Sequence, residues 1–166
     1  MSQGGVLSDG SVRLRPARLP DDVAIGPPWY TDPEVLRFSE GEGTPAYDRA
    51  TVERMYRHLA ERGELYIIEV EDQGHRRAIG DTALCRDALP IVIGEAAYRS
   101  RGLGARVLRL LVDRARALGW DRLAVQGVYT SNERARRLFE RAGFVTTGCA
   151  ADEQGVAKWQ MELRLR

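Results

Sequence analysis

The sequence contains one long amphipathic helix pattern, and the segments on either side of it leave few folds open to the chain. Apolar side chains recur at spacings of three and four residues from Leu103 to Leu118, which places them on one face of an α-helix. An apolar run over residues 88–93 precedes this helix, and Leu123–Val128 follows it as a predicted strand. A strand, a helix and a strand in this order form a right-handed crossover that joins two parallel strands. The chain should therefore contain a sheet with this helix packed on one face.

The rest of the chain supplies further strands and helices around this crossover. We expect α/β architecture of the α+β kind, a mixed sheet with helices on both faces. Residues 1–11 are predicted to be a mobile N-terminal tail, and residues 12–166 a single domain. Strands are predicted at residues 12–15, 65–70, 78–84, 144–150 and 158–164, and helices within 19–63, including Asp48–Glu61, and from an N-cap at Ser131 to Ala142.

Composition and charge exclude several classes of protein. Hydrophobic residues make up 43% of the 166 residues and charged ones 30%, the balance of a globular protein with a sizeable core. The net charge of +1 gives little attraction to nucleic acid or anionic lipid. No apolar run is long enough for a membrane span, and the N-terminus lacks signal-peptide features, so we expect a cytoplasmic protein. The two cysteines and two histidines lack metal-ligand spacing, so no metal is expected.

The segment between the apolar run and the long helix predicts an anion site. It reads YRSRGLG over residues 98–104 and carries Arg99 and Arg101. Glycines let successive backbone N–H groups turn toward one point, and the start of a helix adds partial positive charge there. The segment is not a Walker loop, because no lysine follows its second glycine, and not a dinucleotide fingerprint, because Val107 takes the place of the third glycine. The alternative is a glycine turn that only begins a helix.

A second motif one strand later makes the interpretation specific. It reads NERARRLFERAGF over residues 132–144. Together the two motifs resemble those of the GNAT superfamily of acetyl-CoA-dependent N-acetyltransferases, with cofactor motif Q/R-x-x-G-x-G/A and a following helix N-x-x-A-x-x-x-Y-x-x-x-G-F. The order of elements over residues 12–164 is also similar to that fold. The resemblance implies a central, mostly antiparallel sheet that splays at the cofactor strand, and acetyl-CoA as co-substrate.

The resemblance also implies a set of cofactor-binding residues. Backbone amides of the glycine loop would hold the CoA pyrophosphate, and main-chain groups of the preceding strand would bind the pantetheine arm and the thioester carbonyl. Asn132 matches a family residue that helps to hold the CoA arm, and the alternative is a helix-start Asn that bonds nearby backbone. The expected cofactor-binding residues are Val92, Ile93, Arg99, Ser100, Arg101, Gly102, Leu103, Gly104, Ala105, Asn132 and Phe139.

The catalytic residues are harder to assign from the sequence. Phe139 stands where the family often has a tyrosine that protonates the departing thiolate, so the usual acid is missing. Tyr129 is another source of a hydroxyl, and a structural tyrosine is the alternative. The cofactor strand carries no carboxylate, so the candidate bases are Asp81, an acid inside a predicted strand, and Glu40. A solvated loop carboxylate is the alternative for Glu40.

The acceptor site is expected between the first two helices and the final hairpin. Trp29, Tyr30 and Phe38 would form an aromatic wall, with Glu40 and Glu42 attracting a cationic amine, although these aromatics could equally be core contacts. The segment around them resembles a branch of bacterial GNAT proteins without a uniform substrate. The leading hypothesis is acetyl transfer to a primary amine of a small molecule or peptide. The alternatives are a non-catalytic acyl-CoA-sensing module and, less well supported, a nucleic-acid binder, and a homodimer is one assembly that the resemblance allows.

Overall fold

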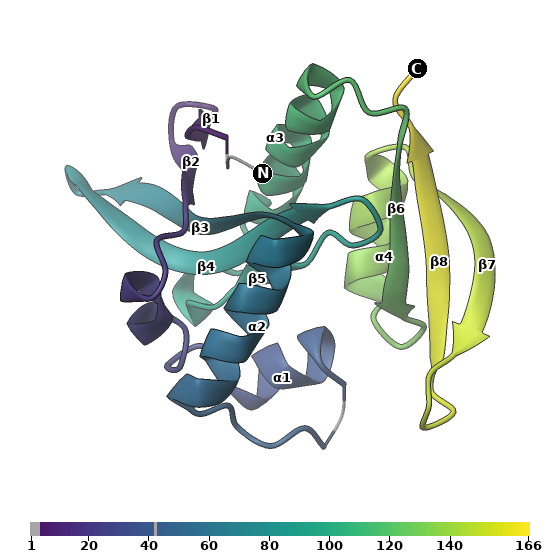
Figure 1. Ribbon diagram of the computed structural model, residues 1–166, viewed down its shortest axis with the longest axis horizontal. Helices are drawn as coiled ribbons and strands as arrows, with labels where there is room; N and C mark the ends of the chain where they lie inside the picture. The colour runs from purple at the N-terminus through teal and green to yellow at the C-terminus, as the bar shows by residue number, and fades with distance from the viewer. Residues whose placement is uncertain (1–3, 42) are drawn as a thin grey trace.

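The computed structural model describes residues 4–41 and 43–166 and arranges them around two antiparallel sheets (Figure 1). The strands are β1 (Leu7–Ser8), β2 (Val12–Pro16), β3 (Gly63–Asp72), β4 (His75–Cys85), β5 (Ile91–Ile93), β6 (Arg122–Tyr129), β7 (Val145–Ala151) and β8 (Ala157–Arg164). The helices are α1 (Pro33–Ser39), α2 (Arg49–Arg62), α3 (Leu103–Ala117) and α4 (Glu133–Arg141), with short 3₁₀ turns at Asp21–Ile25 and Ala96–Tyr98.

The sheet is split at the point where the cofactor strand was predicted. A five-stranded sheet has the order β1-β2-β3-β4-β5, and a three-stranded sheet has the order β6-β8-β7. Figure 1 shows the second sheet standing apart from the first. The crossover prediction needs correction here, because β5 and β6 belong to different sheets and share no ladder among the described strands. The two sheets meet where the Ala124 amide donates to the Arg86 carbonyl at 3.2 Å.

Helices cover both faces of the five-stranded sheet, as the sequence predicted. Successive residues of a strand point to opposite faces. Leu65 of β3 accordingly packs in a core with Tyr56 of α2, whereas Tyr66 packs in a second core with Val107 and Leu111 of α3. Both β3 and β4 are therefore buried on two sides, and no described helix is long and apolar enough to cross a membrane.

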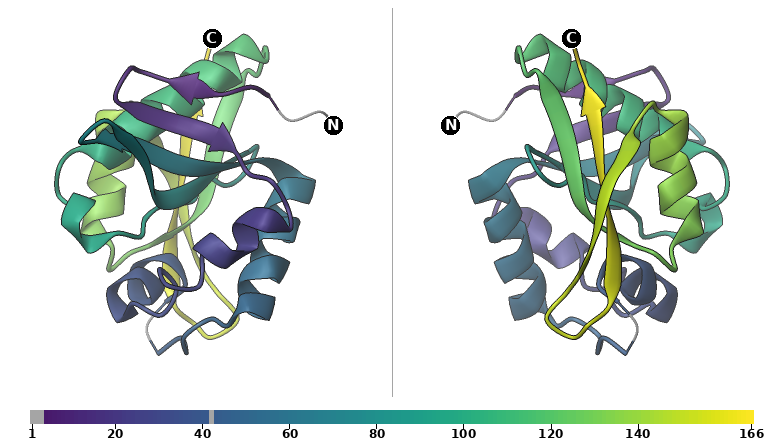
Figure 2. Two further views of the ribbon diagram at one scale, coloured as in Figure 1. Left: turned by 90° about the vertical axis from the view of Figure 1, so that its left-hand side faces the viewer. Right: turned by 90° about the vertical axis from the view of Figure 1, so that its right-hand side faces the viewer.

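The expected N-terminal tail does not hold for residues 7–11. Leu7 and Ser8 form β1, which pairs with β2 in antiparallel register, and Leu7 packs against the core. Figure 2 shows this pair of strands beside α3, where Asp9 forms an ion pair with Arg106 at 2.6 Å. Two residues are too few for a strand pattern to be visible in sequence, and residues 1–3 of the expected tail lie outside the described residues.

Side-chain caps fix where the helices near the site begin. Asp32 caps α1 by accepting from the Glu34 amide at 3.0 Å. Asp48, the predicted first residue of the second helix, is the N-cap of α2, which begins at Arg49. The predicted N-cap of α4, Ser131, is wrong by one residue. Asn132 takes that position because its Oδ1 accepts from the Ala135 amide at 3.1 Å.

Candidate functional site

A cavity of about 450 Å³ opens between α1, β5, the glycine loop and α4. Its walls come from segments on both sides of the split between the sheets, so it exists because β5 and β6 diverge. Most of the predicted cofactor-binding residues line it together. These are Val92, Ile93, Arg99, Ser100, Gly102, Leu103, Gly104, Ala105 and Asn132.

The glycine loop presents the start of α3 to this cavity. Gly102 adopts a left-handed conformation with φ of +76° and precedes the helix without any side-chain cap. The first N–H groups of an α-helix have no partner inside the helix, so those at Leu103, Gly104 and Ala105 need an external acceptor. No acidic residue lies in the first turn of α3. This end of α3 is therefore suited to bind an anion.

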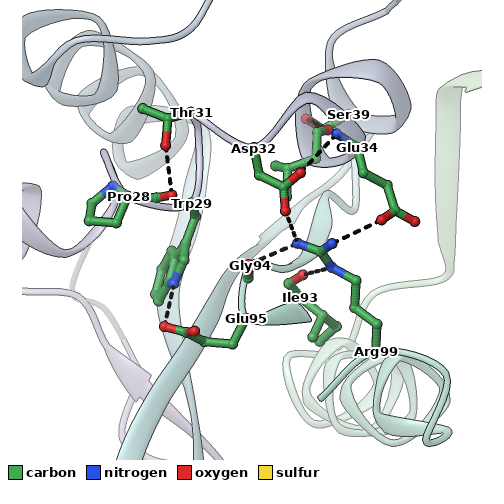
Figure 3. A network of polar contacts seen from close by, with 11 residues as sticks. Pro28, Trp29, Thr31, Asp32, Glu34, Ser39, Ile93, Gly94, Glu95 and Arg99 are labelled. Carbon is green, nitrogen blue, oxygen red and sulfur yellow. Dashed lines mark hydrogen bonds and ion pairs between the residues drawn. The ribbon is translucent and has the colours of Figure 1, made fainter. Parts of the chain in front are cut away.

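Arg99 has protein partners that its place in the motif did not suggest (Figure 3). Its Nε donates to the Ile93 carbonyl at 2.8 Å, and one terminal nitrogen donates to the Gly94 carbonyl at 2.8 Å. The guanidinium also forms ion pairs with Asp32 at 2.9 Å and with Glu34 at 3.1 Å. All three nitrogens of the guanidinium thus have protein partners. Arg99 lines the cavity as predicted, and carboxylates distant in the sequence balance its charge, so its contribution to cofactor binding stays a prediction.

Two arginines that the sequence analysis missed do face the cavity. Arg134, Leu138 and Arg141 line it from α4, at spacings of four and three residues that put them on one helix face. Both arginines are exposed, and among the described residues no carboxylate pairs with either. The same spacing is visible in the printed sequence, but it identifies a cavity face only once α4 is known to lie against the glycine loop.

Of the other residues predicted to bind the cofactor, Asn132 lines the cavity, whereas Arg101 and Phe139 do not. Asn132 lines the cavity, but its Oδ1 caps α4, so only its side-chain nitrogen is left to donate to a ligand. Arg101 is not part of the lining and lies over the Tyr98 ring, 5.3 Å from its centroid. Phe139 is buried and packs edge-to-face on Phe144, with ring centroids 5.2 Å apart. Phe139 therefore belongs to the core of the protein and not to the cavity wall.

Asp81 is buried away from the cavity. Its side chain accepts hydrogen bonds from the hydroxyls of Tyr30 at 3.0 Å and Tyr56 at 2.7 Å. Burial raises the pKa of Asp81 to about 6, although the two tyrosine hydrogen bonds oppose the shift. The residue lies opposite Val92 in the ladder between β4 and β5, and it is not among the residues that line the cavity. In this arrangement Asp81 joins α2, through Tyr56, and the turn that holds Tyr30 to the sheet.

Glu40 and Tyr129 lie together at the end of α1. The Tyr129 hydroxyl donates to the Glu40 backbone carbonyl at 3.1 Å, and the Lys158 ammonium lies 4.7 Å from the Tyr129 ring centroid. Burial raises the pKa of Glu40, while a hydrogen bond from Tyr47 and the charge of Lys158 oppose the shift. Ser39, the residue before Glu40, lines the cavity. A half-buried carboxyl with a raised pKa beside a cavity can accept a proton from a bound group.

The expected aromatic wall is only partly present. Phe38 lines the cavity from α1. Trp29 and Tyr30 are buried in the core between α2 and the sheet, as the alternative interpretation held. Glu42 lies outside the described residues. Among the described residues, no group of three His, Cys, Asp or Glu side chains is arranged to hold a metal ion.

The sequence of the chain matches a family model over most of its length. The model is described as an acetyltransferase (GNAT) domain, and it matches residues 11–145. The chain belongs to the GNAT family. The resemblance inferred from the glycine loop and the α4 motif is thereby confirmed, and the split between β5 and β6 is the splay that this family membership implied.

Solved structures of GNAT and other proteins share the fold of this GNAT chain at low sequence identity. A spermidine N-acetyltransferase from Vibrio cholerae, in complex with CoA and spermine, is 17% identical with a TM-score of 0.76, covering 95% of this chain and 97% of that one. An aminoglycoside acetyltransferase in complex with coenzyme A and kanamycin is 20% identical with a TM-score of 0.74, covering 93% and 95%. A domain from Methanocaldococcus jannaschii is 17% identical with a TM-score of 0.78, covering 94% and 99%. No functionally curated protein matches the sequence of this GNAT chain.

Proposed function

We propose that this GNAT protein transfers an acetyl group directly from acetyl-CoA to a primary amine of a small molecule or peptide. The observation that carries the proposal is the uncapped start of α3, which opens into the same cavity as the edge strand β5 and the end of α1. The cavity thus holds the anion site, and Glu40, a carboxyl with a raised pKa, is not a lining residue but directly follows Ser39, which is. The two neighbours with amine ligands, spermine and kanamycin, support an amine acceptor.

Different segments of the chain are proposed to bind the pyrophosphate and the pantetheine arm of acetyl-CoA. The amides of Leu103, Gly104 and Ala105 hold the pyrophosphate, because they lack internal partners at the positive end of the α3 dipole. Strand β5 is the edge of its sheet, so the pantetheine arm is proposed to lie along the side of Val92 and Ile93 that faces away from β4, where the Ile93 carbonyl already accepts from Arg99. The bound thioester supplies an activated acetyl carbon for attack by the amine.

Glu40 is the proposed general base, which accepts the proton of the attacking amine. Burial raises the pKa of Glu40 and makes it a stronger base than an exposed glutamate. Asp81 is the less suitable base, since its carboxylate is only 1% exposed and is held by two tyrosine hydroxyls. Transfer breaks the carbon–sulfur bond and releases CoA as a thiolate, whose pKa near 8.5 lets it leave without a strong acid. Tyr129 remains the proposed source of a hydroxyl for the thiolate, and it would have to give up its hydrogen bond to the Glu40 carbonyl to donate there.

Acetyl-CoA should stabilise the folded protein. A ligand at a hundred times its dissociation constant adds about 2.7 kcal/mol to the free energy of unfolding, which raises the midpoint of thermal unfolding by roughly 5–10 °C for a protein of this size. The measurement is a thermal scan with and without acetyl-CoA. Turnover of spermidine, spermine or kanamycin above the buffer rate would then exclude the alternative of a sensing module, and an unchanged midpoint at millimolar acetyl-CoA would contradict the cavity assignment.

The two cavity-facing arginines of α4 should add to the affinity for acetyl-CoA. Replacing Arg134 or Arg141 by alanine is expected to weaken binding by roughly three- to tenfold each, because an unpaired guanidinium beside the cavity is available to a CoA phosphate. Arg137 lies on the same helix, is exposed, and does not line the cavity, so Arg137→Ala is the matched control. Isothermal titration at two salt concentrations measures the effect. Equal losses in all three variants would mean that only the overall charge matters.

A further inference from the structure

Arg99 connects three segments that are far apart in the sequence. Its backbone belongs to the loop that leads into α3, it donates to carbonyls at the end of β5, and its ion pairs reach the N-cap and the first turn of α1. Figure 3 shows the guanidinium lying between these partners. The Arg99 side chain is only 13% exposed, so solvent screens these interactions less than it screens surface ion pairs.

We infer that Arg99 is a positioning residue: it ties α1 to the end of β5, so that the acceptor-side wall of the cavity and the cofactor loop close as one unit. The inference rests on the proposed function, since it concerns the same cavity. It adds that binding of acetyl-CoA at the glycine loop and ordering of α1 are energetically linked. In this role Arg99 acts through its protein partners Asp32, Glu34, Ile93 and Gly94.

Helix α1 is short, and the Arg99 ion pairs add polar contacts at its start to the packing of its two buried residues. It has only seven residues, and a helix of this length is not stable on its own. Val35 and Leu36 are its buried residues, and Val35 and Phe38 also form part of the cavity wall. At the far end of α1 the Glu40 carbonyl accepts from Tyr129. The Arg99 ion pairs are thus the polar link between the start of α1 and the cofactor strand.

The position of α1 bears directly on both halves of the proposed reaction. The helix forms one wall of the cofactor cavity with Val35, Phe38 and Ser39, and the chain continues from it into Glu40. A shift at the Asp32 end would therefore change the shape of the cavity and the placement of the proposed base. Because the same guanidinium holds the Ile93 and Gly94 carbonyls, such a shift also acts on the end of β5.

Two conservative substitutions can weaken the ion pairs of Arg99 while leaving helix α1 in place. Asn is as good an N-cap as Asp, so Asp32→Asn keeps the hydrogen bond to the Glu34 amide and removes one charge. Glu34→Gln keeps the shape of the side chain and removes the other. The control is Asp87→Asn, which removes one charge from another arginine–carboxylate pair, Arg62 to Asp87 at 2.7 Å, a more exposed pair away from the cofactor cavity. Unliganded unfolding midpoints of all variants show whether they are folded.

The test is hydrogen–deuterium exchange with and without acetyl-CoA. In the unaltered protein and in Asp87→Asn, acetyl-CoA should slow exchange both at residues 99–105 and at residues 34–39. In the Asp32→Asn/Glu34→Gln variant, slowing at 99–105 should persist, whereas slowing at 34–39 should fall by at least about fivefold, the lower end of couplings between sites. In Glu34→Gln alone, the slowing at 34–39 should be intermediate between that of the unaltered protein and that of the double variant. This single variant keeps the test informative if the double variant does not fold.

The other outcomes overturn the inference in distinguishable ways. Equal ligand-induced slowing at 34–39 in the double variant and the control would show that the ion pairs do not link α1 to the cofactor loop. Slowing at 99–105 but not at 34–39 in the unaltered protein would show that there is no linkage to explain. No slowing at either segment would contradict the proposed function and, with it, this inference.

Discussion

Replacing Gly104 with glutamate is expected to abolish the binding of acetyl-CoA. The new carboxylate would lie at the uncapped start of α3, where the pyrophosphate is proposed to bind. Like charges placed together cost several kcal/mol, so the affinity should fall by at least about a hundredfold. Titration of the variant with acetyl-CoA, followed by calorimetry or thermal shift, measures this loss.

The environment of Gly104 permits a clean control for this variant. A Cβ added at Gly104 would lie 3.6 Å from Leu138, an ordinary van der Waals distance, and the residue does not need a positive φ. Gly104→Ala should therefore fold and bind almost normally, and Gly104→Gln separates the effect of bulk from that of charge. Binding that is unchanged in Gly104→Glu would contradict the assignment of the anion site.

Replacing Glu40 with glutamine is expected to lower kcat by about 10²–10⁴-fold, the usual contribution of a general base. Glutamine has the same shape, and the hydrogen bond from Tyr129 goes to the backbone of residue 40, so the end of α1 should keep its position. The measurement is the steady-state rate with an amine acceptor that the unaltered protein turns over. The affinity for acetyl-CoA should stay close to that of the unaltered protein.

The pH dependence gives an independent check on Glu40. A base acts only when ionised, so the rate should fall as the pH drops through the raised pKa of Glu40. The Glu40→Gln variant should lack this acidic limb of the profile. Asp81→Asn provides the comparison, because it should lower the free energy of unfolding without removing the limb. A normal profile in Glu40→Gln with the limb lost in Asp81→Asn would assign the base to Asp81 instead.

Local patterns allowed much of the fold and of the cofactor cavity to be predicted. The spacing of apolar residues in α3, the glycines before it and the Asn at the start of α4 each depend on neighbours within a few positions. Family membership, the glycine loop and the split at the cofactor strand could accordingly be inferred from short motifs. Strand β1 was missed because two residues carry no periodic signal.

The same local sequence patterns could not predict which side chains contact one another in the folded protein. Asp81 stood out as an acid inside a strand, but nothing in the sequence indicated that hydroxyls from Tyr30 and Tyr56 would enclose it. Arg134 and Arg141 are two of many arginines in the chain. Only the packing of α4 against the glycine loop, with Leu138 beside Gly104, turns their face of the helix toward the cavity.

The sequence by itself determined the GNAT fold and predicted an anion site at the start of α3, because backbone geometry and hydrophobic periodicity are encoded in consecutive residues. The tertiary structure alone decided what each charged side chain does. Arg99 heads the cofactor motif, yet its partners Asp32 and Glu34 lie more than 60 positions earlier in the chain. A charge is available to a ligand only where the fold brings no opposite charge to it, and that depends on which distant segments pack together.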